Sequence, residues 1–185
     1  MKRQFIAVGA SLLLVACGQG DVDLKNATVA DVVKATVVSK TINPGEWSVT
    51  NEVTAVDMPG MPAEAKQMMT AMSKAMVGKK DIAESCVTKE IAEKPPAEMF
   101  AGKDGGACKF EKFAIDNGEL NAVMTCANPK GGPGGMTMKM AGQYGGNSYD
   151  INSEMTMSGM GNSPAGAAMI VKSHSSGKRT GECKA

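Results

Sequence analysis

Hydrophobic and polar residues alternate along much of this chain with the period of two that predicts half-buried β-strands. Trp47, Val49 and Val53, for example, share one parity, and the other parity carries serine, threonine and glutamate. The strand pattern covers residues 46–56, 109–115, 119–126, 136–144, 149–157 and 168–175. Asn117-Gly118 is a strong signal for a two-residue hairpin turn. The pattern predicts a twisted antiparallel β-meander of about five or six strands.

Three other segments have the features of helices. Thr28-x-x-Asp31 has the form of a capping box, with aspartate in place of glutamate, and valines follow at helical spacing. The main helix is predicted over residues 63–77, and a shorter one from Thr88. The apolar stripe of the main helix contains Ala65, Met68, Met69, Met72 and Met76. Together the elements predict an α+β fold in which the main helix packs on the sheet.

The N-terminus has the layout of a secretory signal peptide. Lys2 and Arg3 precede an apolar stretch that is too short to span a bilayer. The stretch ends in Leu14-Val15-Ala16-Cys17, which resembles a bacterial lipobox, where the cysteine becomes the acylated first residue of the mature chain. Gly18 follows, and aspartate there would indicate retention in the inner membrane. The resemblance implies a lipid anchor in the outer membrane, with the chain facing the periplasm.

These signals divide the chain into three parts. Residues 1–16 are the expected signal peptide, residues 17–27 a lipid-anchored tether, and residues 28–185 a single domain. The net charge of +1 becomes about −1 when Lys2 and Arg3 leave with the signal. A nearly neutral chain without a dense basic patch is not expected to bind nucleic acid. Aromatic residues make up only 4%, so methionine must fill much of the core.

Four cysteines remain after Cys17, and an even number in an exported chain predicts two disulfides. Three connectivities are possible, of which we expect Cys86–Cys108 with Cys126–Cys183. The competing bridge is Cys108–Cys126, across the predicted hairpin. A two-residue turn places Cys108 opposite Ala127, so the two sulfurs lie on opposite faces unless a bulge intervenes.

Residue types that support catalysis are sparse. His174 is the only histidine, and no nucleophile-elbow motif accompanies it. Asp150 and Glu154 share the polar parity of one strand, where carboxylates are normally solvated. The glycine-rich runs 131–135 and 159–166 do not join a buried strand to a helix, which argues against phosphate binding. We expect neither enzymatic activity nor a cofactor.

The methionines are the sharper candidates for function. Their thioethers are soft ligands that suit Cu(I), and the candidate metal ligands are Met136, Met138, Met140, Met155 and Met157. Their phase with Tyr144, Tyr149 and Ile151 instead favours the inward side of a sheet. As a third possibility, they line a pocket between sheet and helix. The candidate lining residues are Met68, Met72, Met76, Met138, Met140, Met155 and Met157.

Several motifs in order resemble a family of bacterial exported proteins grouped as domain-of-unknown-function family number 3617. The matching motifs are Pro44-Gly45-Glu46-Trp47-Ser48-Val49-Thr50, Met58-Pro59-Gly60-Met61-Pro62, Cys86-Val87-Thr88, Cys108-Lys109-Phe110, Met124-Thr125-Cys126, Met136-Thr137-Met138-Lys139-Met140 and Gly181-Glu182-Cys183. One departure is Lys89, where the family pattern has proline. The resemblance implies no activity, ligand or catalytic residue.

The sequence thus favours a lipid-anchored envelope protein that is not an enzyme. Its Met-lined concave side is expected to bind an apolar ligand or a protein partner. The membrane is its expected partner through the N-terminal lipid. The alternative function is periplasmic binding of Cu(I) through methionine thioethers.

Overall fold

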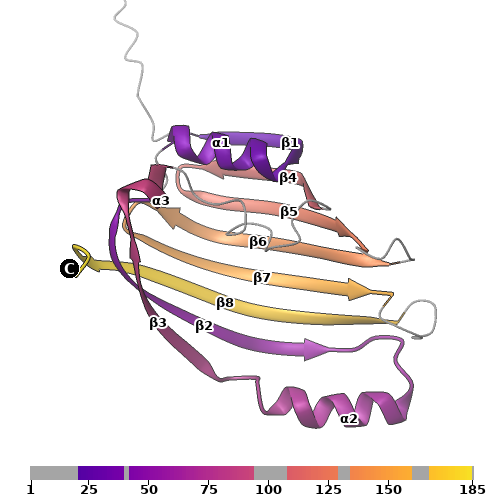
Figure 1. The fold of residues 1–185 in the computed structure, drawn as a ribbon. Coiled ribbons are helices and arrows are strands. Elements are labelled where there is room, and N and C mark those ends of the chain that lie inside the picture. The colour runs from indigo at the N-terminus through magenta and orange to yellow at the C-terminus, as the bar shows by residue number, and fades with distance from the viewer. Residues whose placement is uncertain (1–20, 40–41, 94–107, 129–133, 160–166, 185) are drawn as a thin grey trace, which may run out of the picture.

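The fold is one open antiparallel sheet of eight strands (Figure 1). The computed structural model describes residues 21–39, 42–93, 108–128, 134–159 and 167–184. In spatial order the strands are β1, β4, β5, β6, β7, β8, β2 and β3. Their bounds are Val22–Thr28 (β1), Gly45–Asp57 (β2), Lys80–Val87 (β3), Cys108–Asp116 (β4), Glu119–Ala127 (β5), Gly135–Gly145 (β6), Ser148–Ser158 (β7) and Ala168–Gly181 (β8).

The sheet has eight strands instead of the expected five or six, because the two edge strands, β1 and β3, were not predicted. The six predicted strands are the six inner ones, β2 and β4 to β8. β1 occupies part of the segment expected to be a tether. It is an edge strand that pairs only with β4. In β3 every residue except Val87 is exposed, so that strand lacks the alternating burial from which strands are predicted. The protein is therefore mostly β rather than an even mixture of helices and strands.

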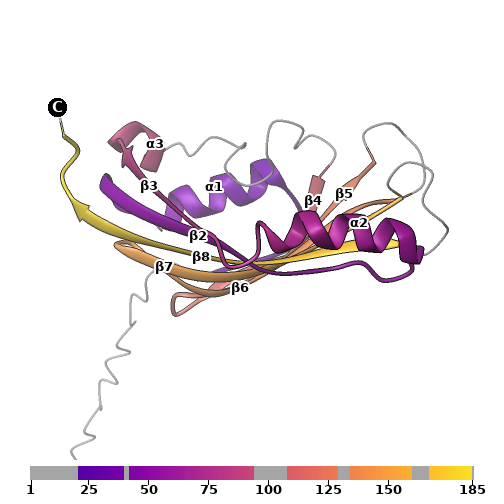
Figure 2. The ribbon, with the colours of Figure 1, turned by 90° about the horizontal axis from the view of Figure 1, so that it is seen from below.

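Three short helices accompany the sheet in the described residues. They are α1 (Val29–Ser39), α2 (Ala63–Lys74) and α3 (Lys89–Glu93). Figure 2 shows the sheet as a curved band with all three helices on its concave side. The helix near residues 63–77 was expected to be the one that packs on the sheet, and this expectation was wrong. It is α1 that packs closely, over β1 and β4, while α2 lies at the opposite edge of the sheet.

A capping box starts α1, as its sequence predicts. The backbone N–H and the hydroxyl of Thr28 donate to a carboxylate oxygen of Asp31, at 2.9 and 2.7 Å. In return the backbone N–H of Asp31 donates to the Thr28 hydroxyl at 3.2 Å. The two bonds from Thr28 hold the pKa of Asp31 below its usual range. Aspartate therefore replaces glutamate in this motif without loss of either contact.

The main core lies beneath α1. Val32 of the helix and Phe110 of β4 are fully buried, and the remaining side chains come from β1, β4, β5 and α1. The buried members are Val22, Ala27, Val29, Val32, Phe110, Phe113, Ile115, Leu120, Ala122 and Met124. The core therefore fills one end of the concave face, and the rest of that face belongs to β6, β7, β8 and β2.

The disulfides are Cys86–Cys183 and Cys108–Cys126, so the expected pairs Cys86–Cys108 and Cys126–Cys183 were wrong. The reason is a β-bulge. Asp116 pairs with Glu119 around the two-residue turn, as predicted, but the register shifts by one residue between Phe110 and Lys112. Cys108 consequently lies opposite Cys126 rather than Ala127.

The bulge has a cause in the packing of β4. Phe110 and Phe113 are both buried in the core although three residues separate them, an odd spacing that a regular strand sends to opposite faces. One extra residue, Glu111, lets both rings point inward, where they meet edge to face with centroids 5.4 Å apart. The same shift brings the two cysteines together.

Candidate functional site: the concave face

Methionines of β6 and β7 lie side by side on the concave face. Met136 pairs with Met157 and Met138 pairs with Met155 in the register of these strands. Met140, two residues further along β6, faces Ser153. All five methionines are half-buried, and the three on β6 contact the core beneath α1. The sequence correctly placed these methionines on one face. We call Met136, Met138, Met140, Met155 and Met157 the methionine face.

Apolar residues extend the methionine face across β8 and β2. Met169 pairs with Met157, and Val171 pairs with Met155. On the next strand, Val56 pairs with Val171 and Val53 with Ser173. These side chains are half-buried as well. A continuous apolar strip thus crosses four strands from the core beneath α1 toward the opposite side of the sheet.

A row of hydroxyl groups that was not among the predicted site residues borders this strip. The Ser153 and Ser173 hydroxyl oxygens are 2.7 Å apart, and Ser175 donates to the side-chain oxygen of Asn51 at 2.7 Å. The same Ser175 oxygen lies 3.5 Å from the Tyr149 hydroxyl. The signal was available, because these serines share the parity of the methionines and valines on their strands. The concave face therefore has a polar row beside its apolar strip.

Stacked aromatic rings occupy the concave face beyond the hydroxyl row. Tyr149 stacks on Tyr144 and on Trp47, with centroids 6.3 and 6.2 Å apart. Gly177 makes the second contact possible, because a Cβ there would lie 2.2 Å from a ring carbon of Tyr149. Trp47 is 2% exposed, and its ring N–H donates to the Asn43 carbonyl at 3.1 Å. This end of the face is therefore closed by packing.

The candidate acids and the histidine lie on the opposite, convex face. The Glu154 carboxylate lies between Lys139 and Lys172, at 3.6 and 3.5 Å from their ammonium nitrogens. The Asp150 carboxylate lies 3.0 Å from Nε2 of His174. Each acid thus has a basic partner on an exposed sheet surface, a pattern typical of solvated cross-strand pairs. The arrangement brings none of these groups to the methionine face.

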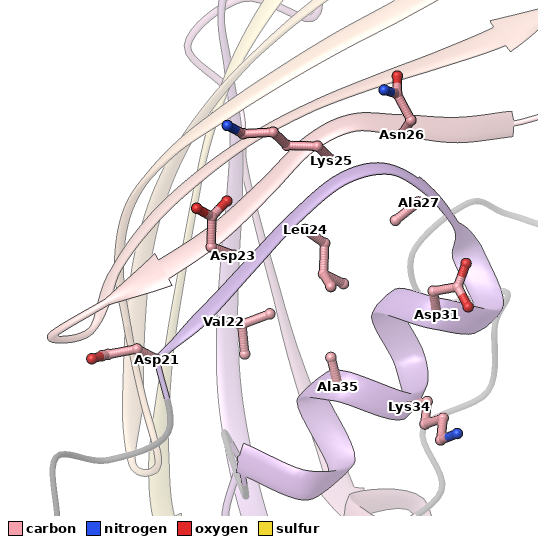
Figure 3. A pocket seen from close by; sticks show the side chains of 10 residues that line it. All are labelled: Asp21, Val22, Asp23, Leu24, Lys25, Asn26, Ala27, Asp31, Lys34 and Ala35. Carbon is pink, nitrogen blue, oxygen red and sulfur yellow. The ribbon is translucent and has the colours of Figure 1, made fainter.

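A hollow of about 710 Å³ lies between β1 and α1 (Figure 3). Asp21–Ala27 line one side of it along the free edge of β1, and Asp31, Lys34 and Ala35 of α1 line the other. Its walls mix carboxylates and ammonium groups with small apolar side chains. This hollow does not follow from the local sequence pattern, since it depends on β1 being an edge strand.

Met68 of α2 and Met76 just after it do not join the methionine face as expected. Met68 is 69% exposed and Met76, just after the helix, is 52% exposed. Met72 belongs to the same expected stripe, but its side chain is outside the described part of the structure. Met68 and Met76 were predicted to line the same pocket as the sheet methionines. That prediction was wrong, because both side chains are exposed to solvent.

Some expected sites fall where the structure gives no description. Cys17, the signal peptide and most of the glycine-rich runs 131–135 and 159–166 lie outside the described residues. Within the described ranges, no helix is long and apolar enough to cross a membrane. No cluster of three or more His, Cys, Asp or Glu side chains that fits a metal ion occurs among the described residues. The two disulfides imply an oxidising compartment outside the cytoplasm.

Comparison with known proteins gives one finding. Residues 42–183, most of the chain, match the model of a family described as protein of unknown function (DUF3617). This agrees with the resemblance carried by the cysteine, methionine and tryptophan motifs. No curated protein and no solved structure matches the chain.

Proposed function

The chain belongs to the DUF3617 family, and from that premise we propose that it is a lipid-anchored envelope protein that binds an acyl chain on its methionine face. The function is binding rather than catalysis. The anchor is Cys17 after cleavage of the signal peptide, in the outer membrane and on its periplasmic side. The disulfides support a location outside the cytoplasm, and the lipobox motif supports the anchor.

The half-burial of the methionine face is the observation that carries this proposal. Five methionines stand together on the concave side of a curved sheet, and α1 packs over the neighbouring strands β1 and β4. Methionine is flexible and polarisable, so a surface made of it adapts to chains of varied shape. A concave apolar surface beside a few placed polar groups is the usual form of a site for a small apolar ligand.

The hydroxyl row gives such a ligand an orientation. Ser153 and Ser173 lie directly beside the methionines, and their hydroxyl groups form a hydrogen bond with each other, an uncharged contact. An acyl chain along the methionines would bring its polar group to the serines and to Asn51. The site therefore fits an amphiphile whose polar group is uncharged.

Binding of a fluorescent fatty-acid ester tests the proposal. Met138→Gln combined with Met155→Gln should weaken binding at least about tenfold, because two apolar contacts are replaced by polar groups. Thr137→Gln combined with Thr156→Gln changes the same two strands on the convex face and should leave affinity unchanged. Equal affinity of the wild type and the methionine variant, with both folded, would refute an acyl-chain site there.

Cu(I) binding is a second candidate, favoured by the facing pairs Met136–Met157 and Met138–Met155. Side chains directly opposite on one face are about 5 Å apart at Cβ, so two thioethers can reach one soft ion. Met138→Leu with Met155→Leu separates the two functions. Leucine keeps the apolar surface and removes sulfur, so this variant should still bind the ester. Loss of Cu(I) from the variant in competition with a colorimetric chelator would support the metal instead.

The lipid anchor has its own test. Cys17→Ser should abolish acylation, because serine offers no sulfur for the lipid, and precursor or soluble protein should accumulate. Metabolic labelling with a palmitate analogue, followed by separation of membrane and soluble fractions, measures both effects. Gln19→Ser serves as the matched control, since it introduces a serine two residues after Cys17 and leaves the cysteine in place. Labelling of the Cys17→Ser protein would contradict the anchor.

A further inference from the structure

Exposed apolar side chains gather in one segment of the described structure. The four large hydrophobic residues that are exposed there are Met68, Met76, Val77 and Ile82, and the two most exposed are Met68 at 69% and Ile82 at 67%. The segment runs from α2 into the edge strand β3, at the side of the sheet opposite to α1 (Figure 1). Contiguous exposed apolar residues commonly mark an interaction surface.

The exposure follows from the way α2 sits against the sheet. Ser73 is buried and Met69 is half-buried, and these residues, four apart, define the packed face of the helix. Met68 precedes Met69 by one residue, which is a rotation of about 100° around the helix axis. Part of the apolar stripe is therefore turned away from the protein. Ile82 pairs with Thr50 and therefore lies on the convex face of the sheet, on the side opposite to α2.

Positive charge is concentrated in the same segment. Residues 63–80 contain Lys66, Lys74, Lys79 and Lys80 against the single acid Glu64, a net charge of +3 in a chain whose total is +1. All four lysines are exposed. Of these, Lys80 forms an ion pair at 3.8 Å with Glu52 of β2. Two exposed acids, Asp81 and Glu84, follow in β3, so the positive charge is confined to α2 and the turn after it.

We propose that this α2 surface, made of Met68, Met76, Val77 and the three lysines Lys66, Lys74 and Lys79, binds the interface of an anionic phospholipid bilayer. Apolar side chains in the company of lysines are the composition of segments that lie in a membrane interface. The charge favours anionic headgroups, and the apolar residues enter the boundary between headgroups and acyl chains. The contact is separate from the methionine face and from any lipid on Cys17. It would hold the edge of the sheet that lies far from β1 against the membrane.

Vesicle co-sedimentation tests the proposal on residues 18–185, which keep every described strand and helix and carry no acyl chain. The protein should partition onto phosphatidylglycerol vesicles and much less onto phosphatidylcholine vesicles. Lys74→Gln with Lys79→Gln should lower the partition coefficient on phosphatidylglycerol by about fivefold for each lysine. Met68→Gln with Met76→Gln, both at exposed positions, should also weaken binding.

The matched control is Lys109→Gln with Lys112→Gln, which removes two exposed lysines from β4 near the other edge of the sheet. It should partition like the wild type. An equal loss in this control, or equal binding to both kinds of vesicle, would overturn the proposal. So would a dimer that forms with rising concentration and disappears in Met68→Gln, because a second copy would then cover the surface. None of these results depends on ester binding at the methionine face.

Discussion

Replacing Cys86 and Cys183 together by serine should lower the free energy of unfolding by about 4–5 kcal/mol. The bridge joins residues 97 apart, and a closed span of this length restricts the unfolded chain strongly. It also fastens β3, whose side chains are exposed except for Val87 and whose ladder runs to β2 alone. Urea unfolding monitored by circular dichroism measures the loss. In this variant, the backbone amides of β3 should exchange their hydrogens faster than those of β4 and β5.

The other disulfide supplies the comparison. Cys108–Cys126 spans only 18 residues within a hairpin, so the same chain-entropy argument gives about 3 kcal/mol for its removal. The double variant Cys108→Ser with Cys126→Ser should therefore unfold at a higher urea concentration than the Cys86 and Cys183 variant. The reverse order would mean that residual structure in the unfolded chain, rather than span length, decides the effect of each bridge.

The inner strands could be predicted from sequence because each has a buried side. In β5, for example, Leu120, Ala122 and Met124 are buried at alternate positions, and the residues between them are exposed or half-buried. The edge strands lack this signature. β1 has Val22 and Leu24 in alternation, but Asn26 then adopts a positive φ of 52° and interrupts the pattern. Pairing at an edge depends on the neighbouring strand, which the local sequence does not specify.

The methionine face was predictable in position but not in exposure. Alternation places Met138 and Met155 on the same side of adjacent strands whatever covers them. Whether that side is buried depends on where the helices pack, and α1 covers β1 and β4 instead. The same limit applies to α2, since an apolar stripe indicates that a helix has a packing side but not how much of the stripe is covered. Met68 lies on the uncovered part.

The spacing of Phe110 and Phe113 contains the information that the disulfide prediction lacked. Counting residues from the turn at Asn117-Gly118 is correct as far as Lys112 and fails beyond it. Two aromatic residues three apart in a strand that buries one face require either an exposed ring or a bulge. Exposing a phenylalanine costs about 1.5–3 kcal/mol in lost burial, so the bulge is the better solution. Cys108 then shares the face of Phe110 and meets Cys126.

Phe110→Ala should lower the free energy of unfolding by about 3–5 kcal/mol, because the ring is fully buried against α1 and Phe113. Val123→Ala is the matched control on the neighbouring strand, at a half-buried position of the convex face, and should cost much less. Urea unfolding of both variants measures the difference. A similar loss in the two would show that the space left by Phe110 is refilled by its neighbours.

Deleting Glu111 tests the origin of the bulge with the ring in place. Without this residue Phe110 and Phe113 become two positions apart, so a regular strand points both rings inward. Lys112 would still face Val123 and Phe110 would still face Met124, which keeps Cys108 opposite Cys126. Peptide mapping without reduction should therefore find Cys108–Cys126 in the deletion protein, and its stability should stay well above that of Phe110→Ala. Free thiols at these two cysteines would show that the bulge itself, and not the inward direction of the two rings, positions Cys108.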